Sequence, residues 1–570
     1  MKVSLNWLKE LVDYQLSAED LAEKISLASI GVKQQTEDYL ELDLTYNRGD
    51  LLSMRGVAYE VAALTDSPLR FLTQTPEDFV WVNQDLSKTK VEIEDQNLAS
   101  AQCVAKIENL TVGPSPKELV KKLEDSGMRS IDNITDITNL VMLEFGQPLH
   151  SFDAETVKNE TIIVRAAKNE EEITTIDHKL RKLQPSDIVL ADSEKPLDVA
   201  GIMGGENTEI KDSTTTILLS ASLFNPINVR RTTQRLNLHS EASRRFQHGL
   251  SSIHTLQALD AAIRMYQDLG GKLTAITLTG NFETTEKKLD LRISKVNSLL
   301  GLNLDEETII KCLQKLNFTV DSHRESGNVV LEVKIPYFRL DINIEEDLIE
   351  EVARIYGYEK IPPKELRGKL PEKLDQSLPN LIYDTKKALA DTGLTEVQTY
   401  SFYSTQALKA LGFNKTNQDK LIKVANPISS ETEYLREFIW PNLVEVIGKN
   451  MRVGYKAIAI FEIGKVYLSV KGDLPKESYR LAIALMNGTD NPIEELIAIA
   501  EAEHLRGGKM RLHLGEGLKP ATLFHPTRFA TIEVSGKTIG GLAEVHPRFL
   551  NNFGIEKHVA ILEITIESLS

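Results

Sequence analysis

The spacing of hydrophobic residues along the chain predicts an α+β protein with several domains. In some segments apolar residues recur every three or four positions, which is typical of helices with one buried face. These segments lie at 18–30, 117–125, 226–236, 252–269 and 442–450. Short runs rich in branched and apolar residues predict strands. Such runs lie at 101–107, 161–166, 216–220, 396–402, 457–467 and 480–486.

Residues 335–358 join a strand-like start to a strongly patterned helix. Asn343, followed by Glu346, matches a helix start in which an Asx cap is joined by a carboxylate three residues later. An apolar face follows at helical spacing, made of Leu348, Val352 and Ile355. Gly357 is placed to end the helix in the left-handed conformation.

Four carboxylates gather near the start of this helix: Asp341, Asp347, Glu350 and Glu351. The last three share one side of the helix, because they stand at i, i+3 and i+4. Two interpretations remain open. The first is a solvated acidic face, which the helix dipole favours near an N-terminus. The second is a site for a hard cation, because oxygen-only ligand sets suit Mg²⁺.

The size and charge of the chain limit what it can be. Its 570 residues are too many for one core and predict three to five domains. With 83 acidic against 66 basic residues, the formal charge is −17, which argues against nucleic-acid binding over the whole surface. It leaves room for a local basic patch or for a partner that supplies one. The one local basic cluster comprises Arg230, Arg231, Arg235, Arg244 and Arg245.

The cellular setting predicted from the sequence is the cytoplasm. Cys103 and Cys312 are far apart in the sequence, and we interpret them as buried thiols in a reducing compartment. No apolar run approaches about 18 residues, so no membrane span is expected. The first residues lack the hydrophobic region of a signal peptide.

Three further segments do not indicate a function on their own. The segment 138–150 is dense in polar groups able to line a pocket, although His150 by itself reads as a structural hydrogen-bonding residue. The glycine-rich segment 200–206 lacks the features of a P-loop or dinucleotide site and reads as a tight turn. The order helix, helix, strand, strand, helix in 291–363 resembles winged-helix DNA binders, but its acidic character argues against groove binding.

Taken together, eight segments resemble one family, the β subunit of bacterial phenylalanyl-tRNA synthetase. They occur over nearly the whole chain and in the family's order, which makes the match very specific. The segments are TYNRGDLLSMRGVAYEVAAL (45–64), DITNLVMLEFGQPLHSFD (136–153), AGIMGGENTEI (200–210), SEASRRF (240–246), residues 335–358, ANPISSETEYLR (425–436), FEIGKVY (461–467) and FHPTRFATI (524–532).

The resemblance implies four domains and a multisubunit enzyme. The expected domains are a small α+β domain (1–75), an editing-type α+β domain (76–285), a winged-helix-like domain (286–365) and a degenerate class II synthetase-like antiparallel-sheet domain (377–570). Two α and two β chains are expected to assemble, with ATP and phenylalanine bound by the α subunit and no complete aminoacylation site in this chain. Asp341, Asp347, Glu350 and Glu351 match family positions that bind Mg²⁺ beside the α subunit.

The resemblance also implies a pocket that hydrolyses tyrosine wrongly attached to tRNA. Tyrosine differs from phenylalanine by one hydroxyl, which an apolar pocket rejects only about 10²-fold. Five residues match pocket positions expected to hold the ester and the attacking water: Thr138, Asn139, His150, Ala200 and Gly204. Ser220 stands where the family has a glutamate that reads the tyrosine hydroxyl. Near it, RFQHGL (245–250) replaces a more acidic segment. A serine is shorter and neutral, so editing is in question while the fold should persist.

Two modules that contact tRNA in the family are expected to be missing. One is an oligonucleotide-binding-fold insert after the helix that ends near Gly31, where 32–39 runs directly into the next strand. The other is a C-terminal anticodon-binding domain, since the sequence stops at Ser570. Tyr46 and Gly49 also replace a proline and a variable residue of the family. These differences leave three expectations open: the chain binds tRNA(Phe) weakly, recognises a reduced tRNA, or no longer serves translation in the usual way.

The sequence therefore favours a shortened β subunit that supports ATP-dependent attachment of phenylalanine to tRNA(Phe). One alternative is a divergent paralogue that acts as an assembly scaffold or serves another amino acid or carrier. A second is a hydrolase of mischarged tRNA.

Overall fold

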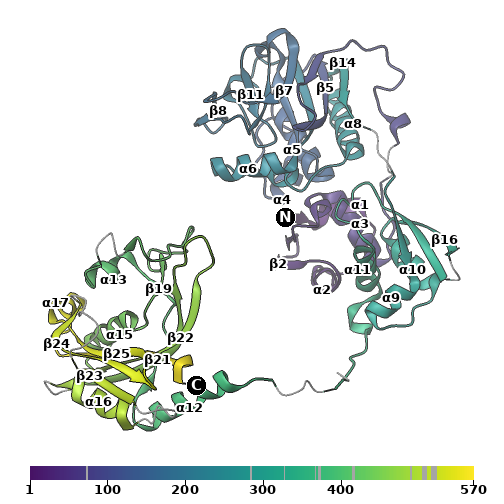
Figure 1. Cartoon of the computed structure of the whole chain (residues 1–570). Coiled ribbons are helices and arrows are strands. Elements are labelled where there is room, and N and C mark those ends of the chain that lie inside the picture. The colour runs from purple at the N-terminus through teal and green to yellow at the C-terminus, as the bar shows by residue number, and fades with distance from the viewer. Residues whose placement is uncertain are drawn as a thin grey trace. The chain divides into compact units, whose positions relative to one another are not determined.

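The protein is described by a computed structural model that covers residues 1–71, 75–282, 286–325, 328–365, 368–369, 374–413, 418–487, 491–502, 510–514 and 523–569. It consists of two compact units, Met1–Glu365 and Leu366–Ser570 (Figure 1). The boundary lies between the expected domains 286–365 and 377–570, and the predicted α+β multidomain class is confirmed. No helix in the described ranges combines the length and the apolar character needed to cross a bilayer.

The first unit begins with a small sheet covered by helices. Its strands are β1 (Lys2–Ser4), β2 (Gly31–Gln35) and β3 (Tyr39–Asp43), in the order β1-β3-β2. Its helices are α1 (Leu5–Leu11), α2 (Ala18–Ala28) and α3 (Met54–Thr65). Trp7 and Leu8 are buried in its core. Strands β2 and β3 form a direct antiparallel hairpin whose turn is residues 36–38, so no domain is inserted at this point.

Two stacked sheets follow. The first has the order β14-β5-β13-β6, and the second has the order β12-β11-β10-β7-β4. The strands are β4 (Lys90–Ile93), β5 (Ala99–Glu108), β6 (Leu149–Asp153), β7 (Thr161–Ala166), β10 (Ile188–Ala191), β11 (Pro196–Val199), β12 (Met203–Gly204), β13 (Ile217–Phe224) and β14 (Lys272–Gly280), with a separate hairpin of β8 (Glu172–Thr174) and β9 (Leu180–Lys182). The helices are α4 (Lys117–Asp125), α5 (Asn133–Phe145), α6 (Pro226–Leu236), α7 (Glu241–Phe246) and α8 (Ser252–Asp268).

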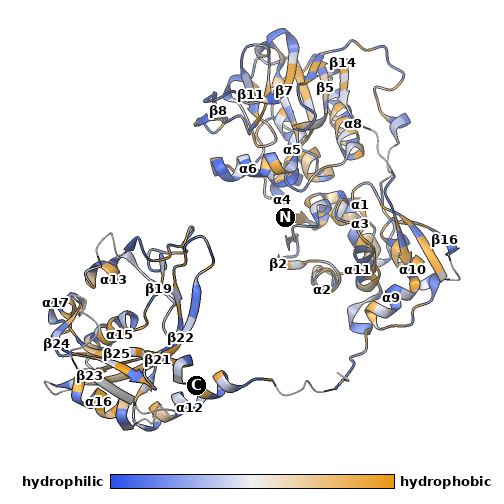
Figure 2. Ribbon diagram, in the orientation of Figure 1, coloured by the Kyte–Doolittle hydropathy of each residue, from blue (hydrophilic) through white to orange (hydrophobic). Residues whose placement is uncertain are grey.

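Alternation along β13 divides its side chains between two cores. Ile217, Leu219 and Ala221 belong to the core shared with α5 and α8, whereas Leu218 belongs to the core between the two sheets. Hydrophobic residues accordingly dominate strands such as β7 (Figure 2). The intervening polar residue Ser220 therefore lies on the side of the sheet that faces the second sheet.

The remaining part of the first unit is a three-stranded sheet with three helices. The strands are β15 (Lys288–Arg292), β16 (Thr319–Glu325) and β17 (Asn328–Lys334), in the order β15-β17-β16. The helices are α9 (Ile293–Leu300), α10 (Glu306–Lys315) and α11 (Glu345–Tyr356). The predicted order of elements omitted β15, whose alternating KLDLR pattern precedes the first helix.

Helix α11 starts differently from the prediction. Its N-cap is Ile344, and the Asp347 carboxylate accepts the backbone N–H groups of both Asn343 and Ile344, at 2.7 and 2.9 Å. The proposed cap at Asn343 and return contact from Glu346 are therefore wrong. Gly357 follows the helix with φ 108° and ψ 115°, so its φ is positive as predicted but its ψ lies outside the left-handed helical region.

The second unit is built on a seven-stranded, mostly antiparallel sheet. Its order is β18-β21-β22-β26-β25-β24-β23, and β18 runs parallel to β21. The strands are β18 (Thr395–Glu396), β21 (Ile458–Leu468), β22 (Lys476–Met486), β23 (Met510–Leu514), β24 (Phe524–Val534), β25 (Lys537–Val545) and β26 (Ala560–Thr565). The helices include α12 (Ser377–Asp391), α13 (Thr405–Ala410), α15 (Trp440–Arg452), α16 (Pro492–Ala502) and α17 (Pro547–Leu550).

The strand predicted at 396–402 is wrong. The chain forms two very short strands there, β18 and β19 (Phe402–Tyr403), and β19 pairs instead with β20 (Tyr434–Leu435) in a separate two-stranded sheet.

Candidate functional site

His150 and Gly204 form the closest part of the predicted hydrolytic pocket. His150 lies on β6 and faces Ser220 of β13 across the antiparallel ladder. Gly204 lies on β12 of the other sheet, and a Cβ placed on it would come within 2.6 Å of Cε1 of the His150 ring. No side chain fits there, so this glycine allows the two sheets to approach around the imidazole. It therefore does more than form the turn that the sequence favoured.

The His150 imidazole is neutral at physiological pH. Burial lowers its pKa to about 4, because the charged form loses hydration. Its ring packs edge-on against Phe152, with centroids 4.5 Å apart. A neutral imidazole can donate one hydrogen bond and accept another, which suits the holding of an ester or a water.

Ser220 is buried and held by a glutamine that the sequence analysis did not identify. Gln102 of β5 donates from Nε2 to the Ser220 hydroxyl at 2.7 Å, and its Oε1 accepts the Ser222 hydroxyl at 2.5 Å. Ser220 is 3% exposed. Gln102 is itself buried and stands as a polar residue among the apolar residues of β5, which is the signal that could have revealed it.

The other predicted pocket residues, Thr138, Asn139 and Ala200, surround His150 and Ser220 less directly. Thr138 and Asn139 lie on α5, which packs against β6, and the Thr138 hydroxyl donates to the Thr135 carbonyl at 2.7 Å. Ala200 is buried in the loop after β11, where its N–H donates to the Ile188 carbonyl at 3.0 Å. The structure thus brings His150, Gly204 and Ser220 together, and their roles stay predictions.

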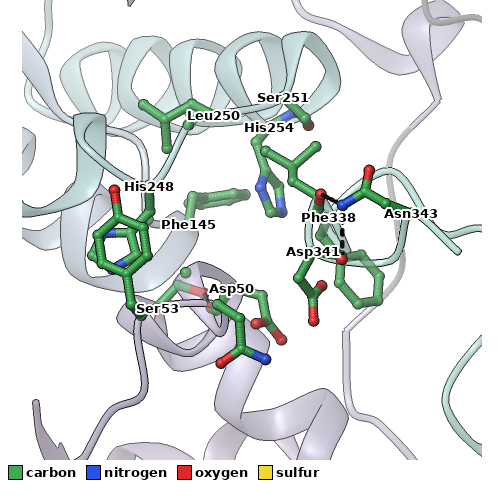
Figure 3. Close-up of a pocket in the computed structure, with 16 residues that line it drawn as sticks. Asp50, Ser53, Phe145, His248, Leu250, Ser251, His254, Phe338, Asp341 and Asn343 are labelled. Carbon is green, nitrogen blue, oxygen red and sulfur yellow. Dashed lines mark hydrogen bonds between the residues drawn. The ribbon is translucent and has the colours of Figure 1, made fainter. Parts of the chain in front are cut away.

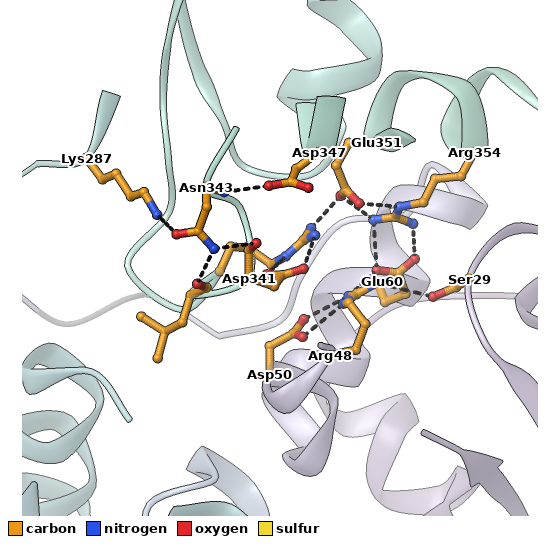
Figure 4. A network of polar contacts seen from close by, with 12 residues as sticks. Ser29, Arg48, Asp50, Glu60, Lys287, Asp341, Asn343, Asp347, Glu351 and Arg354 are labelled. Atoms are coloured by element: carbon orange, nitrogen blue, oxygen red, sulfur yellow. Dashed lines mark hydrogen bonds and ion pairs between the residues drawn. The ribbon is translucent and has the colours of Figure 1, made fainter. Parts of the chain in front are cut away.

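We call the four carboxylates near the start of α11 the acidic corner: Asp341, Asp347, Glu350 and Glu351. Two of them, Asp341 and Glu351, form ion pairs with arginines (Figure 4). Arg339 binds Asp341 with two parallel hydrogen bonds of 2.9 Å and also contacts Glu351. Glu351 in turn accepts from Arg354, at 2.8 Å from Nε and 2.7 Å from Nη2. Side chains of Arg339 and Glu351 are 2% and 3% exposed, so water does little to screen these charges.

The same network continues into the first domain. Arg354 reaches Glu60 of α3, and Glu60 is also bound by Arg48 at 2.9 Å. Arg48 makes a bidentate pair with Asp50, at 2.8 and 2.9 Å. We call these seven residues the arginine–carboxylate network: Arg48, Asp50, Glu60, Arg339, Asp341, Glu351 and Arg354. It holds three cations against four anions and joins α3 to α11.

The four carboxylates predicted to bind Mg²⁺ do not fit a cation in this arrangement. Asp341 and Glu351 are neutralised by guanidinium groups, Asp347 is committed to the backbone at the start of α11, and Glu350 is exposed. Within the described ranges, no three or more His, Cys, Asp or Glu side chains are disposed to hold a metal ion. The two interpretations of the sequence were a solvated acidic face and a metal site. Neither included Arg339, which lies two residues from Asp341 and supplies the opposite charge.

A cavity of about 270 Å³ lies beside this network (Figure 3). Asp50 and Asp341 form its polar wall, and Phe145, His254 and Phe338 supply its aromatic surface. Burial lowers the pKa of His254 to about 4, so this ring is neutral as well. Phe338 also stacks on Tyr59 of α3, with centroids 4.6 Å apart, which adds an apolar contact to the joint between the domains.

The second unit has its own cavity of about 400 Å³ on the sheet formed by β22 and β24–β26. Its walls are largely apolar and include Trp440 and Phe524. One ion pair, Arg480–Glu563 at 3.0 Å, borders it. The Glu563 carboxylate also accepts the backbone N–H groups of Ile439 and Trp440, each at 2.9 Å, so it anchors the start of α15.

Comparison with known proteins covers nearly all of the chain. Residues 99–271 match the B3/4 domain, residues 289–358 the tRNA synthetase B5 domain, and residues 361–566 the phenylalanyl tRNA synthetase beta chain CLM domain. The division into four domains stays a prediction.

Full-length relatives carry one name. The chain is 32% identical over 561 residues to the phenylalanine–tRNA ligase beta subunit of Geobacter sulfurreducens, covering 95% of this chain and 68% of the relative. It is 34% identical to the subunit of the same name from Syntrophus aciditrophicus, covering 97% and 69%. A solved N-terminal fragment of the phenylalanyl-tRNA synthetase beta subunit from Pyrococcus horikoshii overlaps 62% of this chain and 99% of the fragment, with 18% identity and a TM-score of 0.34. By its continuous similarity to the two full-length subunits, this chain belongs to the family of phenylalanine–tRNA ligase β subunits.

Proposed function

We propose that this chain assembles with an α subunit and supports the ATP-dependent attachment of phenylalanine to tRNA(Phe). The observation that carries the proposal is the match to named β subunits over 95% and 97% of the chain. The matched domains also follow one another along both units. We expect two α and two β chains, with ATP and phenylalanine bound by the α subunit, and we place the enzyme in the cytoplasm, where translation occurs.

The pocket around His150 is proposed to hold the ester of a wrongly charged tRNA. The neutral imidazole and the polar pair Ser220 and Gln102 support this role, because they offer hydrogen bonds without a fixed charge. With Ser220 in place of a carboxylate, the pocket is expected to discriminate poorly between tyrosine and phenylalanine, since hydrogen bonds to neutral groups are weaker than those to ions.

The proposed use of Mg²⁺ belongs to the ligase reaction as a whole. ATP takes part in such reactions together with Mg²⁺, and that ion would be held mainly by phosphate oxygens. The arginines that fill the acidic corner argue against a resident ion at Asp341, Asp347, Glu350 and Glu351.

Coexpression with the α subunit encoded in the same genome tests the proposal. The two chains should copurify, and the pair should form phenylalanyl-adenylate in a pyrophosphate-exchange assay and charge tRNA(Phe). The α subunit alone is the control and should be inactive or much weaker. A stable pair that exchanges no pyrophosphate in the presence of phenylalanine would rule out the ligase function.

A further inference from the structure

One exposed face of α6 borders a groove that the proposed function does not use. Ile227, Arg230, Arg231 and Gln234 stand at i, i+3, i+4 and i+7 and therefore share this face. The groove has a volume of about 490 Å³, and its other wall is formed by Tyr46, Gln247 and His248. It lies entirely within the first unit.

The arginines of the basic cluster differ in how their charge is used. Arg235 pairs with Asp187, and Arg244 and Arg245 both pair with Glu241. Arg230 and Arg231 form no ion pair with any carboxylate in the described part of the chain, and both are exposed. In a chain with 83 acidic residues, two adjacent guanidinium groups without a carboxylate leave a concentrated positive charge in the groove.

The opposite wall is aromatic. Tyr46 is 59% exposed, and the Arg230 guanidinium lies 5.3 Å from the centroid of its ring. Tyr46 packs on the His248 ring with centroids 4.7 Å apart, and its hydroxyl donates to the Gln247 carbonyl at 3.1 Å. These contacts restrain the ring, and Tyr46 still has more than half of its surface exposed. An exposed, restrained aromatic ring beside guanidinium groups that have no carboxylate partner among the described residues is an arrangement on which nucleic-acid bases can stack.

We propose that this groove binds an unpaired, single-stranded segment of RNA, with Arg230 and Arg231 on phosphates and a base stacked on Tyr46. The proposal rests on the proposed function, because it names a further contact surface for the RNA that the enzyme handles. A small phosphate would not need the aromatic wall, and a duplex keeps its bases stacked on each other, so neither uses the whole groove. Gln234 and Gln247 supply neutral donors and acceptors for base edges.

Binding of a fluorescein-labelled, unstructured RNA octanucleotide to the full chain, alone and with its α partner, tests the groove. The double variant Arg230→Gln/Arg231→Gln should weaken binding about tenfold and lower the slope of log K against log salt by about 1.4, because each phosphate contact on a single strand contributes about 0.7. Tyr46→Leu should weaken binding at least about fivefold, whereas Tyr46→Phe should bind like the unmodified chain.

Matched controls separate the groove from general electrostatics. Arg129→Gln removes one positive charge, against two in the double variant, from an exposed position in the same unit and should leave affinity within about twofold. A duplex of the same length should bind more weakly than the single strand. The proposal fails if Arg129→Gln weakens binding as much as the double variant, if Tyr46→Phe is as weak as Tyr46→Leu, or if the duplex binds equally well. Equal thermal unfolding of all variants excludes misfolding.

The test of RNA binding in the groove can fail independently of the test of the proposed ligase function. Adenylate formation by the pair needs no RNA, so it is measured on the same preparations. Normal adenylate formation with unchanged RNA binding in the groove variants overturns the groove alone. Weakened RNA binding in a pair that forms no adenylate overturns the ligase function alone.

Discussion

At the scale of single residues, Ser220 is the substitution with the clearest chemical consequence. The change Ser220→Glu should raise hydrolysis of tyrosyl-tRNA by the complex about tenfold. A carboxylate beside His150 and Gln102 would accept the tyrosine hydroxyl, and hydrogen bonds to charged groups contribute about 1.5–3 kcal/mol. Release of labelled tyrosine from tyrosyl-tRNA measures the rate.

Ser220→Gln is the matched control, since it has nearly the same size without the charge. It should leave the tyrosyl-tRNA hydrolysis rate near that of the unmodified complex. An unchanged rate in Ser220→Glu, with normal aminoacylation, would count against the assignment of this pocket.

Arg339 is the residue on which the acidic corner depends. Arg339→Met should lower the free energy of unfolding by about 3–5 kcal/mol, because it leaves Asp341 and Glu351 buried with less compensation. Urea unfolding measures the change. Lys295→Met is the comparison, because it removes a more exposed cation of α9 that pairs with Glu345 and Glu346 in the first turn of α11, and it should cost less than about 1 kcal/mol. Similar losses for both variants would contradict the importance assigned to Arg339.

The same corner gives a prediction about metal removal. The thermal midpoint of the first unit in the unmodified chain should be the same in millimolar Mg²⁺ and in EDTA, since guanidinium groups already neutralise its carboxylates at this corner. In Arg339→Met, Mg²⁺ should raise the midpoint, because oxygen ligands are then released. Scanning calorimetry with and without the ion measures both. A midpoint of the unmodified chain that falls in EDTA would support the magnesium site predicted from the sequence.

At the scale of elements, the contact between α3 and α11 depends on pH. Burial by itself raises the pKa of Glu60, but the neighbouring Arg354 and Arg48 outweigh it and bring the pKa down to about 2. A carboxylate with a lowered folded-state pKa stabilises the fold above its unfolded pKa, near 4.5, and this contribution is lost as the pH falls toward 2. The shift corresponds to about 3 kcal/mol.

Stability of the first unit should therefore fall between pH 4.5 and pH 2, and Glu60→Gln should flatten that dependence. The variant should also be less stable than the unmodified chain at pH 7, because Arg48 and Arg354 lose a charged partner. Urea unfolding across this pH range measures the slope. Glu19→Gln, at an exposed position of α2, should leave the slope unchanged. An unaltered slope in Glu60→Gln would exclude Glu60 as its source.

The helices and strands themselves were largely predictable where periodicity was long and local. Helices α4 and α6 begin and end where the pattern placed them, at 117–125 and 226–236. The strand prediction failed where hydrogen bonding to distant segments of the chain determines the secondary structure. The segment 396–402 is divided between two sheets, because β18 pairs with β21 whereas β19 pairs with β20.

At the scale of the whole molecule, the two compact units should unfold separately. Each has its own hydrophobic cores, and among the described residues no buried cluster contains side chains of both Met1–Glu365 and Leu366–Ser570. Calorimetry of the full chain should give two transitions. Arg339→Met should lower the midpoint of one transition and leave the other in place. A single transition that moves as a whole would show that the units are thermodynamically coupled.

The sequence by itself determined the family and the α+β class, because these depend on ordered motifs and local periodicity, whereas the pocket residues that it proposed stay predictions. Tertiary structure alone decided what those residues do with their charge. It paired Asp341 and Glu351 with arginines up to twelve positions away and joined Glu60 to Arg354 across almost three hundred residues. Among the residues that the structure describes, it left Arg230 and Arg231 without carboxylate partners. The strength of an ion pair depends on the distance between the two charges in the folded protein, and the number of residues between them in the sequence does not give that distance.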